Sequence, residues 1–348
     1  MDEVRPQPSG PGRTGPRFGV VGVGSLGFHH TRIARDLPDA RLSGFHDADS
    51  ARARHVAAEL GVASFDSLAA LLDEVDAVVI ATPTTTHEEV AVAALERGIH
   101  VFIEKPIAPG LDAADRILDS AARSGALVQV GHVERFNGAI VAARPYLDRP
   151  LFIESHRLAP FTERGTDVAV VLDLMIHDVD LVGSLVGEEV ESFEATGAPV
   201  LTPSVDIANA RIRYRGGAVA NLTASRVSVD RLRKIRIFQR SGYLSLNLAD
   251  GTGEFLRLRG ELPALDPGKD MGPSGSFPLA TNLLDLVERI PLRSAGAEPL
   301  RLEQESFRDA IMGRVAPAVS GEEAREALAV ALSIEDRIMS HVADSRSQ

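Results

Sequence analysis

The chain has 348 residues, of which 44% are hydrophobic and 25% are charged, and its formal net charge is −12 at pH 7. This length exceeds what one hydrophobic core usually supports, so two domains are expected. The negative charge is spread over both halves and argues against a nucleic-acid partner, because a polyanion is repelled unless basic residues gather on one face.

The chain contains no cysteine, which excludes a disulfide framework, thiolate catalysis and metal sites with sulfur ligands. Residues 1–16 are rich in proline and glycine and lack the apolar stretch of a signal peptide, so we expect a disordered segment. No apolar run reaches the length of about 18 residues that a transmembrane helix needs. We therefore expect a cytoplasmic protein without a membrane partner.

Residues 17–136 predict a Rossmann domain, a doubly wound parallel sheet. Short β-branched runs alternate there with amphipathic segments, the order that covers both faces of a parallel sheet with helices. Two expected helices end at Gly98 and Gly125, which are typical helix stops. The expected strands are residues 18–23, 41–47, 77–81, 100–104 and 127–131.

Residues 137–348 predict a second domain of the α+β class, because strands there follow strands. A helix-like stretch from Asp167 to Val186 comes first, and two helices at about residues 300–313 and 321–340 close the chain. Between them we expect an open, mainly antiparallel sheet and a Pro- and Gly-rich loop at 263–278. The open sheet face predicts a homodimer or homotetramer. The expected strands are residues 190–197, 207–214, 218–227, 233–240, 243–248 and 254–259.

A glycine motif, Gly22-Val-Gly24-Ser25-Leu26-Gly27, follows the first expected strand and opens a helix-like segment. In such a motif the first glycine permits a tight turn and the second lets the backbone approach a pyrophosphate. The third allows close packing of helix on strand, and the helix N-terminus attracts the phosphates. The motif and its context predict a dinucleotide site.

Asp47 lies 20 residues beyond Gly27, at the end of the second expected strand. A carboxylate there can accept hydrogen bonds from the ribose hydroxyls and repels a 2′-phosphate, so NAD is favoured over NADP. If the strand ends later, Asp49 takes this role instead.

Two further segments carry side chains suited to proton chemistry. Lys105 follows Glu104 at the end of the fourth expected strand, and open α/β sheets bind ligands at the carboxyl ends of their strands. Asp173 and His177 lie one helical turn apart in an otherwise apolar segment. Histidine suits proton exchange with an alcohol near neutral pH. From the spacing alone, a capping or core-packed pair is the more frequent interpretation.

The sequence resembles the Gfo/Idh/MocA family, named after glucose-fructose oxidoreductase, inositol dehydrogenase and the rhizopine catabolism protein. The resemblance runs through most of residues 17–340. It is carried by GVGSLGFHH, the strand-end Asp47, ATPTTTHEEVAVAALERGIHVFIEKP, VGHVERFNGA and DLMIHDVD.

The resemblance implies an NAD-dependent enzyme that moves a hydride to or from a sugar carbon in a crevice between the domains. His177 would be the general base, Lys105 would hydrogen-bond the reacting oxygen, and Asp173 would orient the sugar or His177. The cofactor would also be lined by Thr82, Pro83, Thr84, His87 and Glu104 together with Ser25 and Leu26, although His87 alternatively only begins a helix. His29 and His30 are expected to pack or cap a helix, and no metal site is expected.

Residues 155–181 and 131–137 resemble a branch of the family that oxidises C3 of UDP-N-acetylglucosamine. That branch prepares a 3-keto sugar nucleotide for a PLP-dependent aminotransferase in lipid A biosynthesis. Arginines bind diphosphate oxygens bidentately, with a domain-bridging salt bridge as the alternative for each. Met175 stands where many relatives have glycine. The implied substrate residues are His132, Glu134, Arg135, Asn137, Arg157 and Arg164.

Three alternatives stay open. Inositol or a free hexose is the second choice of substrate for a dehydrogenase. A glycoside hydrolase on the same fold would keep NAD bound and produce no net NADH. A non-catalytic NAD sensor is disfavoured by the presence of Lys105, Asp173 and His177 together.

Overall fold

The computed structural model describes residues 15–162, 168–259, 287–294, 296 and 298–346. Contacts divide the chain into two units, one within Met1–Phe136 and Ala297–Ser333 and the other within Asn137–Gly296 and Ile334–Gln348. The sequence-based ranges differ from this division, because they assign residues 297–333 to the second domain. Residues 1–14 of the expected disordered segment and the expected loop at 263–278 lie outside the described residues.

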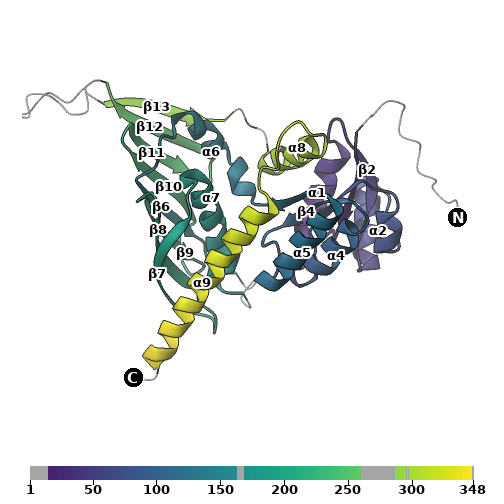
Figure 1. The fold of residues 1–348 in the computed structure, drawn as a ribbon, viewed down its shortest axis with the longest axis horizontal. Helices are drawn as coiled ribbons and strands as arrows, with labels where there is room; N and C mark the ends of the chain where they lie inside the picture. Colours follow the sequence, from purple (N-terminus) through teal and green to yellow (C-terminus); the bar gives the residue numbers. More distant parts are fainter. Residues whose placement is uncertain (1–14, 163–167, 260–286, 295, 297, 347–348) are drawn as a thin grey trace, which may run out of the picture. The chain divides into compact units, whose positions relative to one another are not determined.

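The first unit contains one sheet of five parallel strands in the order β2-β1-β3-β4-β5, which confirms the predicted Rossmann fold (Figure 1). Apart from edge strand β2, the strands are apolar and buried along nearly their whole length, as parallel strands covered on both faces should be. The strands are β1 (Arg17–Val21), β2 (Arg41–His46), β3 (Ala77–Ile80), β4 (His100–Glu104) and β5 (Val128–Gly131).

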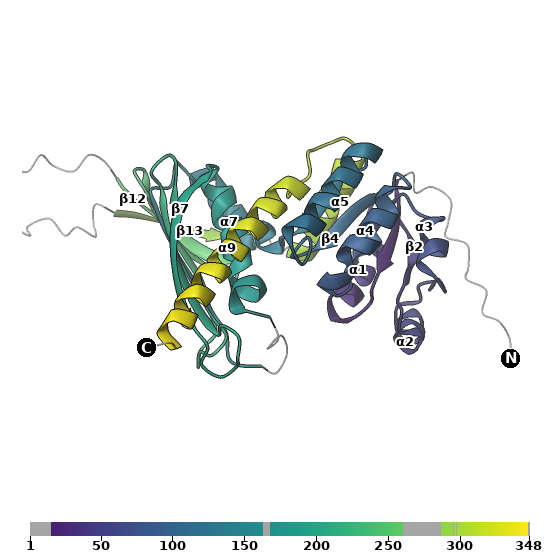
Figure 2. The same cartoon turned by 60° about the horizontal axis from the view of Figure 1, so that its bottom comes forward.

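Helices of the first unit cover its sheet, and α4 and α5 lie side by side (Figure 2). Helix α5 ends at Gly125, whose φ of +72° needs a residue without a β-carbon. The helices are α1 (Ser25–Arg35), α2 (Ser50–Leu60), α3 (Leu68–Leu72), α4 (His87–Leu95), α5 (Leu111–Ser124) and α8 (Pro299–Ile311), with 3-10 turns η1 (Thr84–Thr86) and η2 (Val133–Phe136).

Helix α8 belongs to the first unit because its apolar side packs into the core of that unit. The ring of Phe307 is fully buried, and its centroid lies 5.8 Å from that of Phe18 and 5.8 Å from that of Phe102. Burying one large aromatic side chain contributes about 1.5–3 kcal/mol to stability. The segment near the end of the chain therefore completes a core that begins at β1.

The second unit contains an eight-stranded sheet in the order β13-β12-β11-β10-β6-β9-β8-β7 (Figure 1). Neighbouring strands are antiparallel except for the parallel pair β6 and β9, which confirms the predicted mainly antiparallel sheet. The strands are β6 (Phe152–Leu158), β7 (Val190–Ala198), β8 (Ile207–Tyr214), β9 (Val219–Ser225), β10 (Leu232–Gln239), β11 (Gly242–Asn247), β12 (Thr252–Leu258) and β13 (Val287–Arg293).

Strands β6 and β13 are absent from the sequence-based prediction, each for a physical reason. The inward positions of β6 include Ser155 and Arg157, and buried polar residues interrupt the apolar alternation of a strand. Strand β13 contains Pro291, which an edge strand tolerates because one side of its backbone needs no partner.

The remaining helices of the second unit include two on one face of the sheet, where α6 contacts β11 to β13 and α7 contacts β6 and β9 (Figure 1). Residues of strand β8 alternate strictly between exposed and buried, so the other face is open. These elements are α6 (Gly138–Ala143), a 3-10 turn η3 (Arg144–Tyr146), a π-helical turn η4 (Val171–Met175) and α7 (Ile176–Val186). Helix α9 (Gly321–Arg346) has residues in both units. Within the described ranges, no helix is long and apolar enough to cross a membrane.

Candidate active site

The glycine loop after β1 has the geometry of a dinucleotide cradle. Gly22 has a φ of +83°, and a β-carbon built on Gly27 would lie 1.9 Å from the carbonyl oxygen of Gly22. Around a β-carbon built on Gly24, no described heavy atom lies within 4 Å. Gly22 and Gly27 therefore allow the close packing, while the space beside Gly24 admits a pyrophosphate.

Helix α1 begins directly after this loop and leaves its first turn open to a ligand. Gly24 is the N-cap residue and has no side chain with which to accept from the backbone N–H groups of that turn. Ser25 and Leu26, at the start of the helix, are exposed. Such N–H groups and the helix dipole favour a bound phosphate.

Asp47 follows β2 directly and is held against the glycine loop. One carboxylate oxygen accepts from the backbone N–H of Val23 at 2.6 Å, and the other accepts from that of Asp49 at 2.8 Å. Asp49 instead caps α2, accepting from the backbone N–H groups of Ala51 and Arg52. This division of roles favours Asp47 over Asp49 as the ribose ligand.

Sequence reasoning missed Arg52, which supports the same loop. Its Nε donates to the carbonyl oxygen of Val23 at 2.8 Å, and its guanidinium also donates to that of Gly24 at 3.3 Å. The guanidinium carbon lies 5.9 Å from the ring centre of Phe28. No signal in the sequence distinguishes Arg52 from other surface arginines, because its partners are backbone carbonyls.

Thr82, Pro83 and Thr84 follow β3 and are at least partly exposed beside the glycine loop. A β-carbon built on Gly22 would lie 2.9 Å from the backbone nitrogen of Thr82, so the two loops touch. The positions suit residues that line a cofactor, as the resemblance implies.

His87 does not line an open site, in contrast to the prediction. It is 1% exposed, with Nδ1 3.0 Å from the carbonyl oxygen of Pro106 and Nε2 3.0 Å from that of Thr82. Burial lowers the pKa of His87 below its ordinary value, although both carbonyls act in the opposite direction. The ring therefore joins the loops after β3 and β4 instead of facing a ligand.

Glu104 ends β4 with its carboxylate turned into the first unit. It is 8% exposed, and Oε1 lies 2.7 Å from Nε2 of the buried His30. Oε2 accepts from the backbone N–H of Lys105 at 3.2 Å. The carboxylate predicted to contact the cofactor is thus held by its own unit, and His30 packs in the core as expected.

Asp173 and His177 both lie in the second unit, but in two different types of helix. Asp173 lies in the π-helical turn Val171–Met175, and His177 lies in the first turn of α7. Both are partly exposed, whereas Met175 between them is fully buried. Single π-helical turns occur frequently at functional sites, because they redirect side chains within a helix.

Arg157 was predicted to bind substrate, but it forms a buried ion pair within the second unit. Its Nε donates to Oδ2 of Asp178 at 2.8 Å and its Nη2 donates to Oδ1 at 3.1 Å. The hydroxyl of Ser155 donates to the same carboxylate at 3.0 Å. Asp178 follows His177 directly, so this pair anchors the start of α7 to strand β6.

Other predicted substrate residues also have structural partners. Nη1 of Arg135 donates to the carbonyl oxygen of Ala318 at 3.0 Å and to the carboxylate of Glu323 at 3.2 Å. The amide of Asn137 caps α6 and donates to the carbonyl oxygen of Leu248 at 2.8 Å. These hydrogen bonds hold elements of the unit to which each side chain belongs. His132, at 1% exposure, and Glu134, at 5%, are equally buried, and Arg164 lies outside the described residues.

The three predicted catalytic residues are distributed over both units. Lys105 belongs to the first unit, and Asp173 and His177 belong to the second. Lysine is rare in this chain, which has three lysines among its 37 Lys and Arg residues, and one of the three is Lys105 at this strand end.

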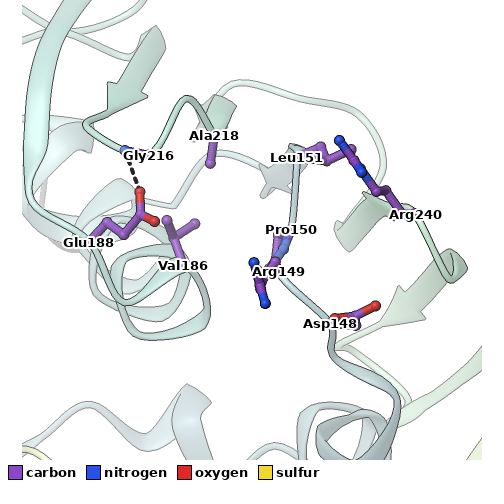
Figure 3. Close-up of a pocket in the computed structure, with 9 residues that line it drawn as sticks. All are labelled: Asp148, Arg149, Pro150, Leu151, Val186, Glu188, Gly216, Ala218 and Arg240. Carbon is purple, nitrogen blue, oxygen red and sulfur yellow. Dashed lines mark hydrogen bonds between the residues drawn. The ribbon is translucent and has the colours of Figure 1, made fainter.

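A separate pocket of about 500 Å³ lies within the second unit (Figure 3). It is next to Val186 at the C-terminal end of α7, whereas His177 is at the other end of that helix. The charged residues that line it have both signs, Asp148 and Glu188 with Arg149 and Arg240. This mixture does not suit a diphosphate, and the described lining includes none of the predicted site residues. In the described part of the chain, no group of three or more His, Asp or Glu residues could hold a metal ion.

Comparison with known proteins places this geometry in one family. Residues 16–132 match the oxidoreductase family with an NAD-binding Rossmann fold, and residues 116–245 match the GFO/IDH/MocA C-terminal domain. The glycine loop and Asp47 supply the groups that such a dinucleotide site needs.

Individual relatives extend the match along nearly the whole chain. It is 36% identical over 320 residues to UDP-N-acetylglucosamine 3-dehydrogenase of Acidithiobacillus ferrooxidans, covering 91% of this chain and 96% of the relative. A solved structure of that enzyme has a TM-score of 0.83 at 34% identity and covers 93% and 98% of the two chains. The scyllo-inositol 2-dehydrogenase (NAD(+)) of Bacillus subtilis is 31% identical over 236 residues, covering 61% and 68%. The chain therefore belongs to the GFO/IDH/MocA family and is an NAD-dependent oxidoreductase.

Proposed function

We propose that the protein oxidises C3 of UDP-N-acetylglucosamine to a ketone, with Lys105, Asp173 and His177 as the reaction centre. The observation that carries the choice of substrate is the 36% identity, along 91% of this chain, to an enzyme named for that reaction. The partly exposed Asp173 and His177 support the chemistry, since Asp173 lies in the π-helical turn directly before α7 and His177 lies in the first turn of α7.

In this mechanism His177 takes the proton of the sugar hydroxyl as general base. The ammonium group of Lys105 donates a hydrogen bond to the same oxygen and stabilises the negative charge that develops there. Asp173 orients His177 or the sugar, as a third group holds a base in place. Bound NAD supplies the acceptor for the hydride that leaves the carbon. The alcohol thus loses one proton and one hydride and becomes a ketone.

The buried residues first predicted to bind substrate have a different role in this proposal. Arg157 and Asp178 hold the start of α7, and with it His177, at a defined position on β6. Arg135 holds the segment after β5 to residues of the same unit.

Incubation with NAD and UDP-N-acetylglucosamine should raise the absorbance of reduced nicotinamide. The increase should be larger when a PLP-dependent aminotransferase with glutamate removes the ketone, because oxidation of an alcohol by NAD is readily reversed. A panel with inositols and free hexoses tests the alternative that the Bacillus subtilis relative supports. Activity on inositol alone would move the substrate to that class, and turnover of a glycoside without net NADH would indicate the redox hydrolase.

The open face of the second sheet supports a homodimer or homotetramer. An aromatic row crosses this face, with ring centroids 5.8 Å apart for Phe152 and Phe238 and 4.8 Å apart for Phe238 and Tyr243. Phe238 is 38% exposed, and burial of such a side chain favours association. Sedimentation of the wild type and of Phe238→Glu tests this, because a charge at the centre of the row should shift the protein toward monomer.

A further inference from the structure

Helix α8 is connected to the strand-end lysine by buried polar side chains of the first unit. The amide nitrogen of Gln304 lies 2.8 Å from Nδ1 of His30, and Nε2 of His30 lies 2.7 Å from Oε1 of Glu104. Gln304 and His30 are fully buried, and Glu104 is 8% exposed. Gln304 and His30 are 274 positions apart along the chain, and His30 and Glu104 are 74 positions apart. Only the tertiary fold therefore brings them together.

The direction of these hydrogen bonds follows from one carbonyl group. The amide nitrogen of Gln304 is also 3.1 Å from the backbone carbonyl oxygen of His30, which can only accept. The amide NH₂ group therefore faces His30, and Nδ1 of the ring accepts its other hydrogen. Nε2 then carries the ring proton and donates it to Glu104. The amide of Gln304 therefore donates to His30, His30 donates to Glu104, and the carboxylate of Glu104 is the last acceptor in this row of hydrogen bonds.

The fixed carboxylate in turn holds the backbone of Lys105. Oε2 of Glu104 accepts from the N–H of Lys105 at 3.2 Å, and the carbonyl oxygen of the following residue, Pro106, lies 3.0 Å from Nδ1 of His87. A β-carbon built on Gly131 would lie 3.0 Å from the carboxylate carbon, so the end of β5 leaves room for it. The backbone around Lys105 is thus held on both sides.

We propose that His30 and Gln304 are positioning residues for Lys105: they fix Glu104, and Glu104 fixes the backbone from which the lysine side chain extends. The proposal rests on the role of Lys105 in the proposed function. Burying three polar groups is costly, Oε1 of Gln304 has no hydrogen-bond partner among the described residues, and an apolar core would serve stability as well. Placement is what such a network adds, because a shift of about 1 Å at a reacting group can lower turnover by about 10²-fold.

The catalytic test compares His30→Leu with His30→Gln and with the matched control His29→Leu. His29 is the exposed neighbour on the same helix. We expect His30→Leu to lower kcat by about tenfold or more while the Kd for NAD stays within about threefold, because only the lysine loses its placement. His30→Gln keeps an N–H donor and should restore most of kcat. If His30→Leu does not fold, Gln304→Leu replaces it and should show the same split. A kcat within twofold of wild type in the leucine variant overturns the proposal, as does a parallel loss in His30→Gln.

A second measurement separates this proposal from the proposed function, because it needs no substrate. Hydrogen exchange at the backbone N–H of Lys105 reports its bond to Glu104, and Pro106 adds no exchangeable amide to the same peptide. Exchange should be at least about tenfold faster in His30→Leu, or in its Gln304→Leu substitute, than in wild type or His29→Leu, since exchange requires that bond to open. If wild type oxidises no sugar but this difference in exchange is present, the proposed function is wrong, whereas the positioning role of His30 and Gln304 is supported. Unchanged exchange overturns that positioning role, whatever the activity.

Discussion

The two units hold their candidate functional groups by different means. In the first unit the backbone shapes the cofactor site: Gly22 and Gly24 shape the loop after β1, and Asp47 follows the carboxyl end of β2 directly. In the second unit a buried ion pair places the helix that carries His177. Groups placed by the backbone leave a pattern in the sequence, whereas groups placed by a distant side chain leave little.

The largest expected effect tests the side-chain anchoring of the second unit. Asp178→Leu leaves the guanidinium of Arg157, 3% exposed, without its carboxylate. Losing one member of a buried ion pair costs about 3–5 kcal/mol of stability. Urea unfolding followed by circular dichroism measures this loss. Arg236→Ala is the control, because its pair with Glu154 is partly exposed and contributes at most about 1 kcal/mol. Equal losses in both variants would show that the buried pair is no anchor.

His177→Ala separates chemistry from cofactor binding across the two units. Turnover should fall by about 10²-fold or more, because the general base is lost, while NAD affinity stays near normal. Steady-state kinetics and calorimetric titration with NAD measure the two quantities. His156→Ala is the matched control, since His156 lies on β6 at a position alternate to the buried Arg157. Turnover that survives in His177→Ala would assign the base to another residue.

The pH dependence of the free energy of unfolding tests Asp206, a second side chain whose hydrogen bonds hold part of the second unit in place. Burial alone would raise the pKa of Asp206, but hydrogen bonds from Thr202 and from the backbone of Val200 and Leu201 outweigh it and lower the pKa to about 2. A lowered pKa stabilises the fold above the ordinary value near 4, and this contribution is lost as pH falls from about 4 toward 2. It amounts to about 2 kcal/mol. Urea unfolding across this range should show a flatter profile for Asp206→Asn, and an unchanged slope would contradict the assignment.

The smallest expected effect tests backbone placement in the first unit. Asp47→Ala should weaken NAD binding by about tenfold, the value of one charge-assisted hydrogen bond, and relax discrimination against NADP. Asp49→Ala should instead remove a helix cap worth about 1 kcal/mol and leave NAD affinity unchanged. Titrations with both dinucleotides and thermal unfolding of both variants decide between them. A change of selectivity in Asp49→Ala would move the ribose contact to that residue.

Sequence patterns predicted more of the first unit than of the second. All five strands of the parallel sheet were expected, and each of them except edge strand β2 is a mainly apolar run closed by glycine or a polar residue. Strand β6 was missed because Ser155 and Arg157 occupy its inward positions. His87 was assigned to the cofactor by family resemblance, and Arg157 was assigned to the substrate by the same resemblance and because arginine suits a diphosphate. The fold instead gives each of them partners in its own unit.

The roles of Lys105, Asp173 and His177 come from the family resemblance. By themselves, sequence patterns determined the two fold classes and the dinucleotide loop. These follow from periodicity, glycine spacing and residue chemistry, which act over short stretches of chain. Tertiary structure alone decided which polar side chains are buried against each other. Gln304 and His30, for example, are 274 positions apart in the chain. The free-energy cost of burying a polar group depends on such a distant partner, which a local sequence pattern does not identify.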